Sequence, residues 1–144
     1  MRALAGDWLV WALLSAVFAA LTAILAKVGV EGVNPELATL IRTAVILVAV
    51  AALVVGLDAW REIGRIGARS WVFLLLSGLA TGASWLCYVR ALKLGQASHV
   101  APVDKLSVVL VAIFGAVMLG ETLSWRGWAG VTMIAVGTLL VAWR

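Results

Sequence analysis

The chain has 144 residues, of which 65% are hydrophobic and 12% are charged, with a formal net charge of +4 at pH 7. A mean hydropathy of +1.13 excludes a water-soluble globular domain, because too few polar residues are left to face water. The surplus of cations predicts contact with lipid headgroups rather than with nucleic acid, since the cations lie in loops and at helix ends.

Five apolar runs occupy most of the sequence, and each approaches the ~20 residues that a helix needs to cross a bilayer. We expect spans at residues 8–29, 37–57, 71–92, 98–119 and 127–143. The connections between them are short, and no repeat or Pro/Ser-rich linker is visible. The pattern predicts an all-α membrane protein of five transmembrane helices, with residues 1–144 forming one domain in the lipid bilayer.

The first two spans each contain a cation. Lys27 ends the first span, and Arg42 lies about 8 Å inside the second. The connection that follows, residues 58–70, carries three arginines between apolar residues at helical spacing. We expect an ordinary cytoplasmic loop there, with a short amphipathic segment at the membrane surface as the alternative.

The third span presents Thr81, Trp85 and Tyr88 at positions i, i+4 and i+7, so they share one helix face. Such a face suits stacking against a flat or cationic substrate, although ordinary helix packing explains it equally well. Arg90 lies near the end of the same span. The single cysteine, Cys87, predicts neither a disulfide within the chain nor a cysteine-based metal site.

The fourth span begins with His99, Pro102, Asp104 and Lys105 in close succession. A proline inside a helix removes one backbone hydrogen bond and clashes with the preceding turn, so Pro102 predicts a helix break that frees carbonyls near Asp104. The alternative is that Pro102 begins the helix. His99 is expected to be a solvated loop residue.

Charged residues within the spans are the strongest functional signal, because each is costly at depth unless it is paired, hydrated or near an interface. They are Lys27, Arg42, Arg90, Asp104 and Lys105. Alternating helix directions place them in one half of the membrane, which predicts the wall of a polar cavity opening opposite the amino terminus. The structural alternative is that Asp104 pairs with Arg42 or Lys27, while Lys27 and Arg90 reach the interface.

The cations also carry information on topology, because an odd number of spans puts the termini on opposite sides. The amino-terminal side holds Arg2, Arg61, Arg65, Arg69 and Arg126, and the loop and tail on the other side hold Lys93 and Arg144. Counted in loops alone, the cations predict a cytoplasmic amino terminus. Counted with the cations inside and at the ends of the spans, the two sides nearly balance.

Motifs for catalysis are missing from the sequence. There is no P-loop, HExxH, GxSxG or paired-carboxylate motif, so we expect no enzyme activity and no metal site. No cofactor is expected either, beyond a coupling ion such as a proton.

The second half of the chain contains an ordered set of short motifs. These are an aromatic-x-x-Ala-Leu helix end, an Ala-Pro helix start, a Gly-Glu-x-Leu turn and a last span with glycines, here Tyr88, Ala91 and Leu92, then Ala101 and Pro102, then Gly120, Glu121 and Leu123, then Gly130 and Gly137. The set resembles an EamA-type domain of the drug/metabolite transporter superfamily, and the first half also fits. The resemblance implies a carrier of small metabolites or drugs in a prokaryotic inner membrane, commonly an exporter.

Most members of that superfamily resemble two five-span halves fused in opposite orientation, and this chain has one. The resemblance therefore implies a homodimer, and the nearly balanced cations permit an antiparallel one. A parallel dimer or a different half-sized partner stays open.

Together these patterns predict a secondary transporter protomer. Asp104 is the candidate coupling or counter-charge group, and Arg42, Lys27 and Lys105 would attract anionic or zwitterionic solutes. The other candidate residues for the substrate site are Arg90, Trp85 and Tyr88. Two alternatives are a flippase for a lipid-linked or amphipathic substrate and an accessory membrane subunit without transport of its own.

Overall fold

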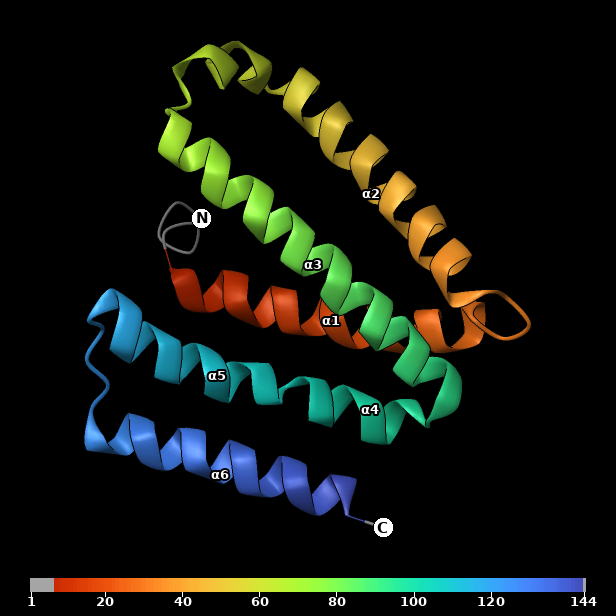
Figure 1. Ribbon diagram of the computed structural model, residues 1–144, viewed down its shortest axis with the longest axis vertical. Helices are drawn as coiled ribbons and strands as arrows, with labels where there is room; N and C mark the ends of the chain where they lie inside the picture. Colours follow the sequence, from red (N-terminus) through yellow and green to blue (C-terminus); the bar gives the residue numbers. More distant parts are fainter. Residues whose placement is uncertain (1–6, 144) are drawn as a thin grey trace. The chain divides into compact units, whose positions relative to one another are not determined.

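The computed structural model describes residues 7–143, which fold into helices and turns without any β-strand (Figure 1). The α-helices are α1 (Trp8–Gly29), α2 (Pro35–Gly56), α3 (Ala68–Leu94), α4 (Ala97–Asp104), α5 (Leu106–Phe114) and α6 (Trp125–Ala142). A 3₁₀ helix, η2 (Ala59–Arg65), precedes α3, and a π-helix, η3 (Gly115–Leu119), follows α5. Arg2 and Arg144, which entered the topology argument, lie outside the described residues.

Five segments of the described chain are long and apolar enough to cross a membrane. They are α1, α2, α3, the composite segment Ala97–Leu119 that joins α4, α5 and η3, and α6. The predicted all-α membrane fold with five spans is therefore confirmed. The first span has the expected bounds, whereas α3 extends beyond both ends of the expected 71–92.

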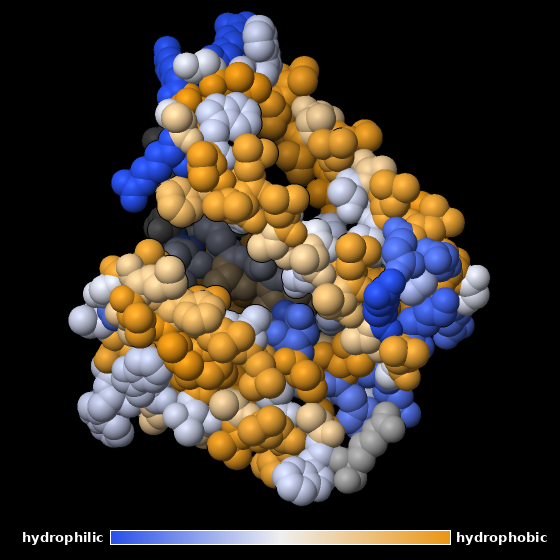
Figure 2. Space-filling view, in the orientation of Figure 1, coloured by the Kyte–Doolittle hydropathy of each residue, from blue (hydrophilic) through white to orange (hydrophobic). Residues whose placement is uncertain are grey.

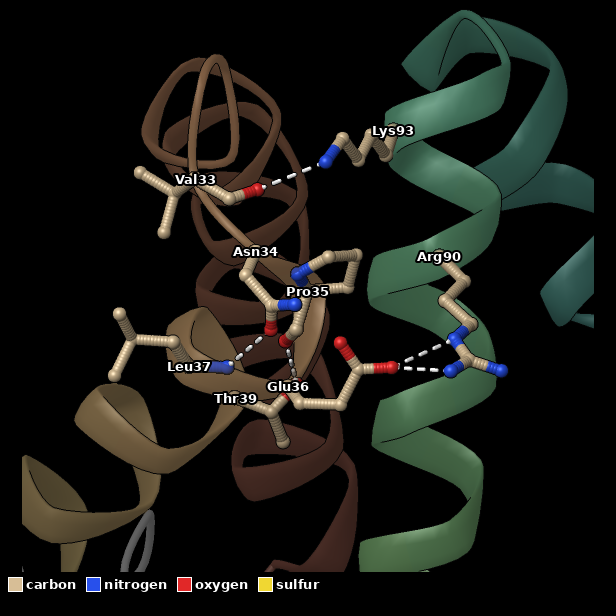
Figure 3. Close-up of polar contacts among 8 residues, drawn as sticks. All are labelled: Val33, Asn34, Pro35, Glu36, Leu37, Thr39, Arg90 and Lys93. Carbon is tan, nitrogen blue, oxygen red and sulfur yellow. Dashed lines mark hydrogen bonds and ion pairs between the residues drawn. The ribbon is translucent and has the colours of Figure 1, made fainter.

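Local sequence explains why α2 begins two residues before the expected position. The Asn34 side chain accepts a hydrogen bond from the Leu37 amide at 3.0 Å, which caps the helix. Pro35 occupies the first turn, where its missing N–H is not needed, and Glu36 places a negative charge at the positive end of the helix dipole. These three residues fix the start of α2 (Figure 3).

The connection at residues 58–70 is more ordered than the expected loop. It turns at Asp58, whose φ is +55°, and continues as η2 before α3 begins at Ala68. Arg61 forms an exposed ion pair with Asp58 at 3.4 Å and lies 5.6 Å from the centroid of the Trp60 ring. The connection between the second and third spans thus contains a 3₁₀ helix, which the sequence did not predict, whereas its cytoplasmic position and the interfacial alternative stay predictions.

The described chain divides into two compact units. One comprises residues 26–93, and the other comprises the described residues before 26 and after 93. The boundaries fall within α1 and next to the last residue of α3. The prediction that residues 1–144 form one domain stays a prediction.

The 26–93 unit has a small core where α1 ends, α2 begins and α3 ends. Val30, Ala38 and Val89 form a buried apolar cluster, and Val33 packs against it. Leu92, near the end of α3, is also fully buried. Burial of these side chains fixes the ends of the three helices together.

In the other unit, α6 lies beside α4 and α5 (Figure 1). The reversal between the two spans depends on Gly120, whose φ of +69° is readily adopted only by glycine. Ser124 then caps α6 by accepting a hydrogen bond from the Gly127 amide at 3.2 Å.

Apolar side chains are exposed along every span. Only 6–11% of the most apolar window of each span is buried, and Figure 2 shows orange, apolar side chains over much of the visible face. Exposed apolar surface of this extent is unfavourable in water, so it must be covered by lipid or by another protein surface. The structure thus places the chain in a lipid bilayer.

Candidate functional site

Three contacts connect the end of α1, the start of α2 and the end of α3 with one another, in a region that we call the junction. Lys93 donates a hydrogen bond from Nζ to the Val33 carbonyl at 3.1 Å (Figure 3). Lys27 donates from Nζ to the Leu92 carbonyl at 2.7 Å. Lys27 thus satisfies a carbonyl near the end of α3, and Lys93 satisfies one in the connection before α2. Both lysines lie in the last turns of their own helices, where positive charge is favoured by the helix dipole.

The third contact is an ion pair between α2 and α3. Arg90 donates two hydrogen bonds to the same carboxylate oxygen of Glu36, one from Nε at 3.0 Å and one from Nη2 (Figure 3). Both side chains remain partly exposed. Glu36 was not predicted as a site residue, because the second span was expected to begin after it; its position next to Pro35 was the signal that it lies at the start of a helix.

Arg42 and Trp85 lie against each other deeper in the same unit. The guanidinium carbon of Arg42 is 5.3 Å from the centroid of the Trp85 ring, within the range of a cation–π interaction. Arg42 lies about 10 Å along α2 from Pro35. Its Nη1 atom is buried and has no hydrogen-bond partner among residues 7–143.

The expected aromatic face on α3 is partly engaged within the protein. Trp85 and Tyr88 are both half-buried, and the Arg42 guanidinium lies over the Trp85 ring. The Thr81 hydroxyl donates to the Ser77 carbonyl at 2.9 Å, so its proton is used within α3. The cation that stacks on Trp85 in this structure is thus a side chain of the protein itself.

The fourth span is interrupted beside Asp104. The helix begins at Ala97, well before Pro102, and α4 ends at Asp104. The Lys105 amide bonds the Pro102 carbonyl at 2.9 Å, and α5 starts at the next residue. Pro102 therefore lies within α4 and does not begin the helix.

Asp104 and Lys105 form a pair at this interruption. Lys105 Nζ lies 3.4 Å from a carboxylate oxygen of Asp104, and both side chains are partly exposed. His99 precedes them in α4, half-buried, with a buried Nδ1 that has no hydrogen-bond partner within the described chain. The expectation of a solvated loop histidine was wrong, because α4 starts before His99, whose amide bonds the Gln96 carbonyl at 3.0 Å.

The predicted site residues therefore fall into two groups. The 26–93 unit holds Lys27, Arg42, Trp85, Tyr88 and Arg90, and the other unit holds Pro102, Asp104 and Lys105. Within the first group, Arg42 contacts Trp85, while Lys27 and Arg90 take part in the junction. The polar cavity that unites both groups stays a prediction.

The Gly-Glu turn after η3 also has a defined geometry. The Glu121 amide bonds the Gly115 carbonyl at 3.1 Å, and a Cβ placed on Gly115 would lie 2.7 Å from Oε2 of Glu121. Glycine at position 115 thus allows the Glu121 carboxylate to lie against the helix backbone. Gly120 and Glu121 were identified from the sequence but Gly115 was not, because nothing in the local pattern shows which earlier residue the turn folds back onto.

Comparisons with known proteins agree with this architecture. Residues 7–143 match the EamA-like transporter family. A protein of Sinorhizobium sp, described as an uncharacterized transporter in the cobO 3' region, is 60% identical over 136 residues, which cover 94% of this chain and 96% of that protein. No solved structure matches the chain. The match over all of the described residues shows that this chain belongs to the EamA-like transporter family.

Proposed function

We propose that this membrane protein is one protomer of a secondary transporter that exports small metabolites or drugs across a prokaryotic inner membrane. Its family and its similarity to a protein described as a transporter support the transport role. The observation that carries the proposal is the pairing of Arg42 with Trp85 inside an apolar span. Charged side chains at such depth in a membrane span are characteristic of substrate and ion pathways.

The proposed active form is a homodimer of antiparallel protomers. Every span exposes most of its apolar surface, so each helix still has room for a partner helix as well as lipid. The similar relative is matched over 96% of its own length, so it too is about the size of one five-span unit. Two inverted copies would reproduce the inverted repeats that frame a central site in many carriers.

Within this proposal the two groups of site residues have different roles. Asp104 lies at the interruption of the fourth span and serves as the coupling or counter-charge group, with a proton as the candidate coupling ion. Arg42, Lys27 and Lys105 give the pathway a positive potential that favours anionic or zwitterionic solutes. The mechanism needs no catalytic step or cofactor, in keeping with a transporter that is not an enzyme.

Transport by inside-out membrane vesicles tests the function. A respiration-driven proton gradient is followed by acridine orange fluorescence while a panel of amino acids, organic acids and amphipathic amines is added one by one. We expect at least one solute to dissipate the gradient through the wild-type protein, and Asp104→Asn and Arg42→Ala to lose that response.

The control is Arg69→Gln, which removes an arginine that lies 5.9 Å from the Phe73 ring, away from the site residues. It should transport like the wild type. If Asp104→Asn and Arg42→Ala both transport normally, the site assignment is wrong although the transport assignment survives.

Dual-reporter mapping tests the antiparallel dimer. Phosphatase and fluorescent-protein fusions are placed at Arg144 and at Arg65 in η2. Comparable activity of both reporters at both positions is expected if the chain inserts in two orientations. A single orientation would overturn the antiparallel homodimer and favour a parallel dimer or an inverted partner of another sequence.

The junction favours one alternative, an accessory subunit without transport of its own. Lys27, Lys93 and Arg90 all contribute to contacts between helices, so these charges have a structural use. Stable copurification with one larger membrane protein, together with no response to any solute in the vesicle assay, would support this alternative.

A further inference from the structure

Arg42 differs from other cations of the 26–93 unit in how its charge is satisfied. Lys27 and Lys93 donate to backbone carbonyls, and Arg90 donates to a carboxylate. Arg42 Nη1 is buried, and no acceptor within residues 7–143 reaches it. The Trp85 ring attracts the cation through its π face but supplies no oxygen lone pair. A buried, charged N–H without an acceptor is strongly unfavourable, so Arg42 requires one.

The nearby hydroxyl groups of α2 do not satisfy this requirement. Thr39 donates to the Pro35 carbonyl at 2.8 Å, and Thr43 donates to the Thr39 carbonyl at 2.8 Å. Both hydroxyls are thus held against their own helix, and although their oxygens could still accept, neither accepts from Arg42 Nη1. The acceptor for Arg42 must come from outside the contacts that residues 26–93 make with one another.

We propose that Arg42 and Trp85 form a binding site for an organic anion, with Arg42 donating to a carboxylate or phosphate oxygen. The site's part in transport rests on the function proposed above, whereas binding itself does not require transport. The proposed site narrows the expected class of solutes from anionic or zwitterionic compounds in general to compounds that present a carboxylate or phosphate oxygen to Arg42.

The geometry of the pair explains this preference. A guanidinium group is planar, and its N–H donors lie in the plane of the group and match two oxygens of a carboxylate or phosphate. The Trp85 ring attracts the cation through its π face and occupies none of its N–H donors, which stay available for such bonds. Because Nη1 has no exposed surface in this structure, neighbouring side chains must move for an oxyanion to reach it. Trp85 therefore orients Arg42 and provides an apolar surface beside the bound oxyanion. A lysine in the same place would offer a point charge without this directionality.

Fluorine NMR of protein labelled with 5-fluorotryptophan tests the site directly. The chain has eight tryptophans, and the Trp85 resonance is assigned from Trp85→Phe. The protein is kept in maltoside detergent, which contains no oxyanion, and is titrated with benzoate or with benzylamine, a cation of similar shape. We expect benzoate, and not benzylamine, to shift the Trp85 resonance to saturation.

Two other tryptophans act as internal controls for non-specific binding of benzoate to arginine. Trp60 has Arg61 at 5.6 Å from its ring centroid, and Trp125 has Arg126 at 5.7 Å. Both rings are exposed, so their resonances should not saturate with Trp85. Parallel shifts at all three tryptophans would overturn a specific site.

Variants identify the donor. Arg42→Gln should weaken benzoate binding at least tenfold. Arg42→Lys should give an intermediate affinity, because it keeps the charge but loses the pair of in-plane N–H donors. Arg69→Gln removes an arginine 5.9 Å from another α3 ring, that of Phe73, and should leave the titration unchanged. If Arg42→Gln binds benzoate like the wild type, the proposal is wrong. The Trp85 resonance is also recorded for each variant without benzoate. If Asp104→Asn and Arg42→Gln then change it in the same way, the acceptor is Asp104 and the proposal is also wrong.

A second arm distinguishes a free solute from a lipid headgroup. The labelled protein is transferred without benzoate into nanodiscs of phosphatidylglycerol, and the Trp85 resonance is compared with that in detergent. An Arg42-dependent shift there identifies a lipid phosphate as the anion, whereas benzoate binding in detergent alone identifies a soluble one; either supports the site. If the protein binds benzoate but transports no solute in the vesicle assay, the anion site is supported and the proposed transport function is contradicted. If the Arg42→Gln variant still transports solute and its Trp85 resonance responds to benzoate as in the wild type, the anion site is refuted but the transport function is not.

Discussion

The contact between Lys27 and Leu92 gives the sharpest prediction for stability. Lys27 is half-buried, and its Nζ donates to the carbonyl of Leu92, a residue with 0% exposure, at 2.7 Å. Lys27→Met keeps most of the length of the side chain but removes the donor and its charge. A hydrogen bond from a charged group contributes about 1.5–3 kcal/mol, so we expect a loss of about 2 kcal/mol in the free energy of unfolding.

Lys93→Met is the matched control, because Lys93 also donates from Nζ to a backbone carbonyl, that of Val33 at 3.1 Å. Lys93 is exposed, and water can replace its contact, so its loss should be below about 1 kcal/mol. Reversible unfolding in mixed micelles of maltoside and dodecyl sulfate, followed by circular dichroism, gives both values. Equal losses for the two variants, or none for Lys27→Met, would refute the argument that burial makes the Lys27 contact the stronger one.

Three further changes test how the sequence specifies the fold, each by the same unfolding measurement. Asn34→Ala removes the cap of α2 and should cost about 1 kcal/mol, whereas Asn34→Asp should retain most of the stability. Gly120→Ala forces a side chain into a backbone with φ of +69° and should cost about 1–2 kcal/mol, while Gly130→Ala, where a Cβ meets no atom within 4 Å, should not destabilise the protein. Glu36→Arg and Arg90→Glu should each lower the unfolding midpoint, and the double exchange should recover part of that loss but not all of it, because the exchanged charges oppose the dipoles of α2 and α3; no recovery would refute a direct pairing.

The spans were predictable from the sequence because bilayer thickness sets a length that apolar runs either reach or do not. Their ends were less predictable, since they depend on single residues such as Asn34, which caps α2. The segment at 58–70 shows the same limit: its arginines indicated an interface, but the turn at Asp58 and the 3₁₀ geometry follow from local backbone contacts.

The pairings between helices could not be predicted from the sequence. A span that is apolar on all sides gives no hydrophobic pattern that fixes its rotation against a neighbour. Arg42 and Trp85 were therefore both identified as site residues, but not as contacting each other. Arg90 was identified without its partner Glu36 for the same reason, compounded by the misplaced start of α2.

Helix electrostatics separates the charges of the spans into two classes. Lys27, Arg90 and Lys93 lie in or near the last turns of α1 and α3, where cations are favoured by the helix dipole and by free carbonyls. Arg42 lies in the first half of α2, away from any helix carboxyl end. Asp104 is the last residue of α4 but lies two residues before α5 begins, so the two helix dipoles act on it in opposite directions, and Lys105 Nζ lies 3.4 Å from its carboxylate. Helix structure alone explains the positions of the first class, but it does not explain that of Arg42. A fold that keeps a charge such as that of Arg42 needs a compensating interaction, and under the function proposed above a bound solute would supply it.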